Sequence, residues 1–146
     1  MVVRSVEEME GKQVYELWVK AWNEDLSVLD EMVHPECVVH QARTDGKSSE
    51  EARGSAALKG MIADAGAFFS DVKMTVTTGP IEEKGYISAR WQFNGVYNGK
   101  MPGAKAEAGK IVRFHGMDMF RLEEGRIREY WVSSDGIDLM KQLQLF

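Results

Sequence analysis

The sequence predicts an α+β domain in which helices pack on one face of a curved antiparallel sheet. Two patterns lead to this prediction. Apolar residues recur at helical spacing in the first half of the chain, and they alternate with polar residues in the second half. Glycine-containing turns separate the alternating segments. No internal repeat or low-complexity linker interrupts the 146 residues, so we expect a single domain over 1–146.

Three helices are expected before the first long strand. Residues 5–23 place apolar side chains on one stripe, and Ser5 with Glu8 fits a capping box. A short second helix is expected over 25–33. A third is expected over 55–69, capped by the serine at its start. Each of these segments therefore has one apolar side to bury.

The strands are predicted from β-branched composition and from alternation with period two. They are expected over 37–42, from 70 to a break at Gly79-Pro80, and over 86–97, 110–122 and 126–134. Polar or glycine-rich loops are expected over 43–54 and 98–109. The tail after 134 is expected to form a helical turn or an arm on the body of the domain.

The last hairpin allows a prediction of which side chains share a face. A three-residue loop at Glu123–Gly125 would place Leu122 opposite Arg126 and Met117 opposite Trp131. One side of the sheet then carries Arg113, His115, Met117, Met119, Glu129, Trp131 and Asp135. The other side carries Val112, Phe114, Phe120, Leu122, Arg128, Tyr130 and Val132.

The mixed side is typical of a small-molecule pocket, in which apolar walls surround a few polar groups. In the alternative interpretation this side faces water, and Arg113 and Asp135 form a weak ion pair across the strands. His115 and Glu129 would be four residues out of register, about 13 Å at ~3.3 Å per residue. They could therefore flank a ligand of one or two rings, or approach each other through a bulge near Gly116.

Composition excludes several classes of function. The net charge of −5 has the wrong sign for a nucleic-acid surface. No apolar run is long enough to cross a membrane, and no secretory segment is recognised. The single Cys37 fits a reducing cytoplasm and has no basic sequence neighbour to make it a nucleophile. Cys37 and His40 would point to opposite faces of a strand, so no metal site is expected, and no cofactor.

Four phrases resemble one known family. They are AWNEDLSVLDEMVHPECVVH (21–40), GSAALKGMIADAGAFFSD (54–71), KGYISARWQFNGVYNG (84–99) and FRLEEGRIREYWVSSD (120–135). Over about 10–143 the chain resembles the SnoaL-like polyketide cyclases, also called ester cyclases, of the nuclear transport factor two superfamily. The resemblance implies a cone-shaped curved sheet, or α+β barrel, with three N-terminal helices enclosing a pocket. It also implies a homodimer.

The resemblance also implies site residues. Glu129 stands where the cyclases carry a general base on the last strand, and His115 and His40 resemble polar cavity positions. This chain departs from the family at Gly95-Val96-Tyr97 and at Pro102-Gly103. Both departures lie at the expected pocket mouth, so the substrate of the family is not transferred.

We therefore expect a cofactor-independent cyclase, of the intramolecular aldol type, or an isomerase acting on an apolar carbonyl compound. Glu129 would be the base, its pKa raised in a dry pocket, and His115 would polarise the carbonyl. The expected substrate-binding residues are His40, Arg113, Met117, Met119, Trp131, Trp91, Trp18 and Asp135. The alternatives are a non-catalytic binding domain of the same fold, and a hydrolase or a dehydratase (a lyase) using the same pocket.

The expected partners follow from the same observations. They are an apolar small-molecule ligand and a second copy of the chain, with no nucleic acid and no membrane. The dimer surface is expected to bury Phe114, Phe120, Tyr130 and Val132.

Overall fold

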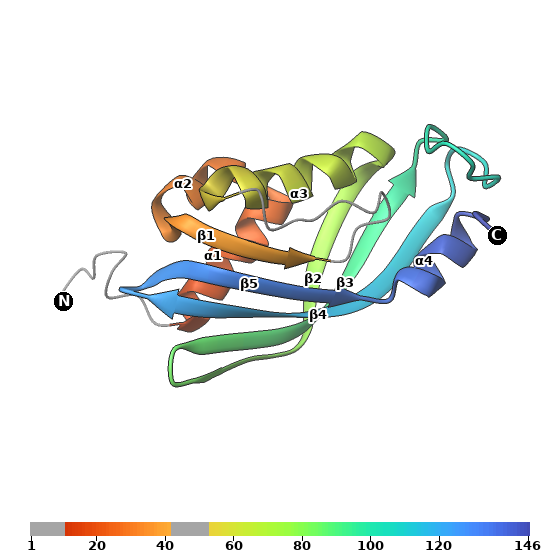
Figure 1. Cartoon of the computed structure of the whole chain (residues 1–146). Helices are drawn as coiled ribbons and strands as arrows, with labels where there is room; N and C mark the ends of the chain where they lie inside the picture. The colour runs from red at the N-terminus through yellow and green to blue at the C-terminus, as the bar shows by residue number, and fades with distance from the viewer. Residues whose placement is uncertain (1–10, 42–52) are drawn as a thin grey trace.

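Helices precede most of the strands along the chain (Figure 1). The computed structural model describes residues 11–41 and 53–146. The elements are α1 (Gly11–Asn23), a 3-10 turn (Leu26–Val28), α2 (Leu29–Met32), β1 (Val33–Gln41), α3 (Gly54–Phe68), β2 (Phe69–Glu83), β3 (Tyr86–Tyr97), β4 (Ile111–Glu123), β5 (Arg126–Ser134) and α4 (Gly136–Gln142). No helix within the described ranges has the length and apolar character needed to span a bilayer.

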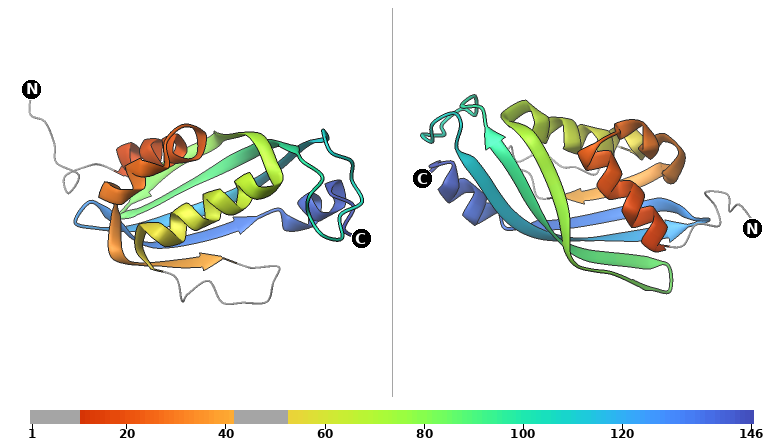
Figure 2. Two further views of the ribbon diagram at one scale, coloured as in Figure 1. Left: turned by 90° about the horizontal axis from the view of Figure 1, so that it is seen from above. Right: turned by 180° about the vertical axis from the view of Figure 1, so that it is seen from behind.

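The five strands form one curved, open sheet in the order β1-β5-β4-β3-β2. Strands β2 to β5 pair antiparallel with their neighbours, whereas β1 pairs parallel with β5. Helices α1 and α3 lie on one side of this sheet (Figure 2). The predicted α+β class is confirmed, and the parallel edge strand corrects the expectation of a purely antiparallel sheet.

Two hairpins are closed by two-residue turns. Lys84-Gly85 joins β2 to β3, and Glu124-Gly125 joins β4 to β5. The φ angles are +53° and +84° in the first turn and +53° and +74° in the second. Positive φ at both central positions defines a type I′ turn, which matches the right-handed twist of the strands. The predicted three-residue loop is therefore wrong by one residue, because Glu123 pairs with Arg126.

A register shift between Arg121 and Leu122 moves the pairing of β4 with β5 by one more residue, so that it differs from the predicted pairing by two residues in total. Met119 therefore faces Trp131, and Met117 faces Ser133. The total shift of two residues preserves the alternation of side chains. Apart from Arg128, the residues predicted to share a face do share it, although their partners across the strands differ from the prediction. Arg128 is the extra residue of the bulge, and its side chain pairs with Glu123 while Ile127 is buried in the core.

The core lies between the helices and the inner face of the sheet, the face against which α1 and α3 pack. Its buried side chains fall into two clusters. The first joins Tyr15, Trp18, Leu58 and Ile62 of the helices to Ile87, Ala89, Phe120 and Tyr130 of the sheet. The second contains Phe69, Trp91, Phe93, Tyr97, Val112 and Phe114. Trp22 and Val132 pack against both clusters.

The helix ends differ from the predicted ones. The predicted capping pair Ser5 and Glu8 lies outside the described residues. Helix α3 starts at Gly54, and Arg53 occupies its N-cap position, where its side chain makes no capping hydrogen bond. The hydroxyl of Ser55 donates instead to Asp30, at 3.3 Å.

Two strands are longer than predicted. Strand β2 continues past Gly79-Pro80 to Glu83, with register shifts on both sides of Thr78. Strand β1 begins at Val33 and so includes Pro35. A proline is tolerated there because β1 is an edge strand, where one side of the backbone needs no ladder partner.

Candidate active site

Asp118 lies in the middle of β4 on the inner face of the sheet. It is 3% exposed, and it is the only buried charged residue among residues 11–41 and 53–146. Strand alternation places it there, because its neighbours on the same face, Gly116 and Phe120, are also buried. The residue opposite it on β3 is the small Ala89, which is also buried.

Three donors hold the Asp118 carboxylate. The hydroxyl of Tyr15 donates to Oδ1 at 2.8 Å. Nε1 of Trp18 and the hydroxyl of Tyr130 donate to Oδ2 at 3.2 and 3.0 Å. A carboxylate offers about four lone-pair positions, and these bonds use three of them. The backbone N–H of Asp118 also acts on the carboxylate.

Aromatic packing fixes the positions of these donors. Tyr15 and Trp18 recur at helical spacing on the buried stripe of α1. The ring of Trp18 lies 5.4 Å from that of Phe120 and 5.1 Å from that of Tyr130. The donors therefore reach the carboxylate as part of the same packing that closes the core.

Burial decides the titration of this cluster. Desolvation raises the pKa of Asp118 to about 6 and outweighs the hydrogen bonds from Tyr15, Tyr130 and Trp18, which act to lower it. Desolvation and the nearby carboxylate both raise the pKa of Tyr15 and that of Tyr130. The two phenols therefore stay protonated and donate, while the carboxyl group titrates just below neutral pH.

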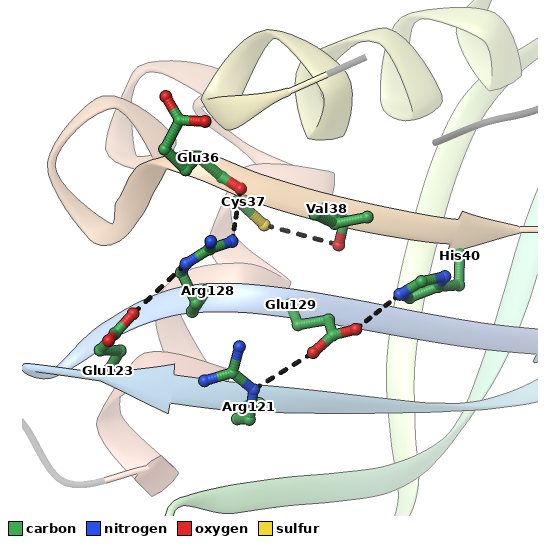
Figure 3. A network of polar contacts seen from close by, with 8 residues as sticks. All are labelled: Glu36, Cys37, Val38, His40, Arg121, Glu123, Arg128 and Glu129. Atoms are coloured by element: carbon green, nitrogen blue, oxygen red, sulfur yellow. Dashed lines mark hydrogen bonds and ion pairs between the residues drawn. The ribbon is translucent and has the colours of Figure 1, made fainter. Parts of the chain in front are cut away.

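Glu129 lies on the opposite, outer face of the sheet (Figure 3). Its carboxylate accepts a hydrogen bond from Nε of Arg121 at 3.2 Å and lies 2.7 Å from Nε2 of His40. Its side chain is 25% exposed. Burial alone would raise the pKa of Glu129, but the hydrogen bonds with His40 and Arg121 outweigh it and lower the pKa. The prediction that Glu129 sits in a dry apolar chamber with a raised pKa is therefore wrong.

The predicted pocket wall is also on this outer face. Met117 is 50% exposed and Met119 39%. Trp131 is half-buried because its ring stacks on His40, with centroids 5.3 Å apart. The helices cover the other face of the sheet, so the expected enclosure of these residues is wrong. Their roles in binding stay predictions.

His115 and Glu129 do not come together. The backbone N–H of Asp135 donates to the carbonyl of His115, whereas Glu129 pairs with Arg121. Six residues of β4 separate these positions, about 20 Å at ~3.3 Å per residue. The bulge lies between Arg121 and Leu122, not near Gly116, and it does not shorten this separation.

Two other predicted binding residues occupy structural positions on the surface. Asp135 is the N-cap of α4, where its side chain accepts from the backbone N–H of Asp138. Arg113 is exposed, and its backbone exchanges hydrogen bonds with the side-chain amide of Gln142. Trp18 of α1 and Trp91 on the inner face of β3, by contrast, are buried in the core, and Trp18 donates to Asp118.

The sequence interpretation did not single out Asp118, although a signal for it was present. The inner-face stripe of β4 consists of Val112, Phe114, Gly116, Asp118 and Phe120. An acidic side chain in an otherwise apolar stripe must either reach solvent or be buried with hydrogen-bond partners, because an unpaired buried charge is too costly. The structure shows the second arrangement.

The described residues contain no group of three His, Cys, Asp or Glu side chains arranged to hold a metal ion. Cys37 is fully buried, and burial raises the pKa of its thiol to about 11. The thiol is therefore protonated at neutral pH and a poor nucleophile.

Helices on one side of an open, curved sheet are the arrangement of the nuclear transport factor two-like α+β folds, and the solved structures compared below share it. Residues 12–143 match the sequence pattern of a family described as "SnoaL-like polyketide cyclase". The chain belongs to the SnoaL-like polyketide cyclase family. The family predicted from the four sequence phrases is confirmed.

Solved structures support the fold. TsrD from Streptomyces laurentii is 24% identical, with a TM-score of 0.77 over 95% of this chain and 100% of that one. IdmH from Streptomyces antibioticus is 24% identical, with a TM-score of 0.79 over 93% and 99%. A SnoaL-like polyketide cyclase from Agrobacterium tumefaciens is 15% identical, with a TM-score of 0.69 over 97% and 99%. A comparison with curated proteins gives no match.

Proposed function

We propose that this protein catalyses a base-promoted cyclisation or isomerisation of an apolar carbonyl compound, with Asp118 as the base. The single observation that carries the proposal is the buried carboxyl group of Asp118, which three donors hold and whose pKa is raised by burial to about 6. Membership of a polyketide cyclase family supports a small-molecule substrate. This proposal replaces Glu129 with Asp118 in the role predicted from the sequence.

The chemistry requires a proton to leave the carbon next to a carbonyl. At pH 7 a carboxyl group with a pKa of about 6 is mostly ionised, and its basicity lies close to the working pH. Oδ1 of Asp118 takes the proton, and an enolate forms. In a cyclisation the enolate carbon then bonds to a second carbonyl carbon, and the resulting alkoxide regains the proton. In an isomerisation the proton returns to a different carbon.

The donors to Asp118 serve this role by holding the carboxylate in one orientation. A positioned general base contributes about 10²–10⁴-fold to a rate, provided that its lone pair is aimed at the substrate proton. The hydrogen bonds from Tyr15, Trp18 and Tyr130 fix that orientation.

The proposal is tested by hydrogen exchange at carbon. 2-Acetonaphthone is an apolar aromatic ketone whose methyl group carries exchangeable α-protons. In D₂O the wild-type protein is expected to catalyse deuterium incorporation into this methyl group, measured by mass spectrometry. The Asp118→Asn variant is expected to lose at least ~10²-fold of that rate. Glu129→Gln is the matched control, because it also converts a carboxylate to an amide but on the outer face.

The control decides between the two assignments. Exchange that survives in Asp118→Asn and disappears in Glu129→Gln would contradict the proposal and restore the assignment made from the sequence. Absence of protein-catalysed exchange with every ketone tried would favour the second candidate, a non-catalytic binding domain. The observation that favours this second candidate is that the three donors already satisfy most of the carboxylate.

The expected homodimer also needs a different surface. Phe114, Phe120 and Tyr130, which were expected to form it, are buried under the helices, and Val132 packs against the core. This part of the dimer prediction is wrong. The exposed apolar side chains of the outer face are Ile81, Ile111, Tyr86, Met117 and Met119. Of these, Tyr86, Met117 and Met119 are 42%, 50% and 39% exposed. We propose that a second copy covers these three.

Light scattering checks this proposal. The wild type is expected to be a dimer at micromolar concentration, and a Met117→Glu, Met119→Glu double variant is expected to be a monomer, because charges would be buried at the interface. A monomeric wild type would contradict the proposal. The control is Ile137→Glu, which places the same charge at an exposed apolar residue of α4.

A further inference from the structure

Two tryptophans on the inner side of the sheet carry N–H groups without partners. Nε1 of Trp91 and Nε1 of Trp22 are buried, and within residues 11–41 and 53–146 neither has a hydrogen-bond acceptor. Trp18, by contrast, donates to Asp118. A buried donor left unpaired costs about 1–3 kcal/mol, so such groups in a folded protein call for an explanation.

Trp91 is the better placed of the two. It is 4% exposed and pairs with Gly116 across β3 and β4. Asp118 is two residues along β4 on the same face, so Trp91 and Asp118 are diagonal neighbours. Side chains in this relation start about 7–8 Å apart and are within reach of each other when one is aromatic.

Gly116 sets the position of the indole ring. A Cβ at this position would lie 2.3 Å from Cζ2, 2.6 Å from Cη2 and 2.9 Å from Cε2 of Trp91. These three atoms belong to the six-membered ring, which therefore lies against β4, the strand of Asp118, and Cε2 is the ring carbon bonded to Nε1. Phe114 supports the ring from the side, with centroids 5.8 Å apart and planes at 75°.

We infer that Nε1–H of Trp91 binds the carbonyl oxygen of the substrate while Asp118 faces the adjacent carbon. This inference rests on the proposed function. A carbonyl oxygen gains negative charge when the neighbouring carbon loses its proton, and a donor already in place stabilises that charge. The base and the donor are then one strand apart on the same face, on either side of a carbonyl group and its α-carbon.

The same arrangement limits the class of ligand. An indole N–H is a donor only, so it selects an acceptor atom. No Lys or Arg among the described residues is buried on this face, whereas Asp118 brings negative charge at neutral pH. A carboxylate or phosphate would be repelled and left without a counter-charge. The ligand is therefore a neutral ketone or aldehyde with an apolar body.

Trp22 is the competing donor. Its ring contacts Trp18 at 6.1 Å and Phe93 at 6.3 Å, so it lies on the helix side of the core. Phe93 is the next inner-face residue after Trp91 on β3. Trp22 therefore provides a control of the same chemistry from the other layer.

The experiment compares 2-acetonaphthone with 2-ethylnaphthalene, which has a CH₂ in place of the carbonyl. Each compound is titrated into the full-length, ¹⁵N-labelled protein, and the indole N–H signals of the four tryptophans are followed by NMR. The ketone alone is expected to move the Trp91 N–H signal downfield. Trp91→Phe is expected to weaken ketone binding about 3- to 10-fold, as for one lost hydrogen bond, and to leave binding of 2-ethylnaphthalene unchanged. Trp22→Phe is expected to affect neither compound selectively.

Three results would overturn the inference: equal responses of the Trp91 signal to both compounds, a ketone-specific shift at Trp22 instead, or no binding of either compound. If Trp91→Phe fails to fold, the wild-type titration still decides. Binding requires no proton transfer, so Asp118→Asn is expected to keep the ketone-specific shift. If no deuterium exchange is catalysed but the ketone still shifts the Trp91 signal, the proposed function is contradicted and this inference stands. If exchange is catalysed but the ketone does not shift the Trp91 signal, this inference is contradicted and the proposed function stands.

Discussion

The stability difference between the Asp118→Asn variant and the wild type is expected to change by roughly 2 to 3 kcal/mol between pH 4 and pH 7, in favour of the variant at the higher pH. The folded pKa of Asp118, about 6, lies above the ordinary value of 3.8. The native state therefore binds this proton more tightly than the unfolded state does. The contribution of Asp118 to the stability of the wild type falls as pH rises from about 4 to about 6, and the variant lacks this contribution.

An asparagine is compatible with the site. Its amide oxygen can replace Oδ2 and accept from Trp18 and Tyr130, and its NH₂ group can donate to the oxygen of Tyr15. The variant therefore removes the charge and keeps most of the hydrogen bonds. Urea unfolding at several pH values measures the difference.

Glu129→Gln is a control with the opposite sign. The pKa of Glu129 is lowered in the folded protein, so its contribution to stability is present above the ordinary pKa and is lost as pH falls. The free energy of unfolding of this variant should therefore fall relative to that of the wild type as pH rises through the acidic range. A pH-independent difference for Asp118→Asn, or one that follows Glu129→Gln in sign, would contradict the burial of the Asp118 charge.

Gly116→Ala is expected to destabilise the protein by about 1–3 kcal/mol, as for overpacking of a core. The new methyl group would lie within 3 Å of three atoms of the Trp91 ring, and that ring is wedged against Phe114. The indole must move, so its near-UV circular dichroism and its N–H signal should change together. Thermal and urea unfolding measure the loss of stability.

Gly60→Ala is the matched control for this substitution. Gly60 lies inside α3, and a Cβ there would meet no atom within 4 Å. Alanine in an open position of a helix interior is expected to stabilise by about 0.5–1 kcal/mol. Equal effects of the two substitutions would show that the Trp91 ring does not rest on Gly116.

Much of the fold was predictable because local patterns determine it. The strands predicted over 86–97 and 126–134 have the observed bounds. Period-two alternation runs through the whole of the first, whereas the bulge at Arg128 interrupts it in the second. The parity of the last hairpin was correct except between the turn and the bulge, where Ile127 occupies the face predicted for Arg128. Alternation says which side chains share a face, and it is insensitive to a shift of two residues.

The choice of the covered face was not predictable in the same way. Both faces of β4 and β5 carry large apolar residues: Phe120 and Tyr130 on one, and Met119 and Trp131 on the other. The deciding contacts come from α1, about 100 residues earlier in the chain, so no local pattern reveals them. The outer network was missed because β1 pairs with β5 across the chain and brings His40 beside Glu129.

The sheet order allows the central strands to pair before the carboxyl group of Asp118 is removed from water. β3, β4 and β5 are consecutive, so they can assemble from nearby segments while water still surrounds Asp118. Tyr15 and Trp18 reach it across 103 and 100 residues of sequence. The penalty for stripping water from that negative charge is therefore concentrated in the arrival of α1. At acidic pH the carboxyl group of Asp118 is protonated before α1 packs over it, so the desolvation penalty of this step is smaller.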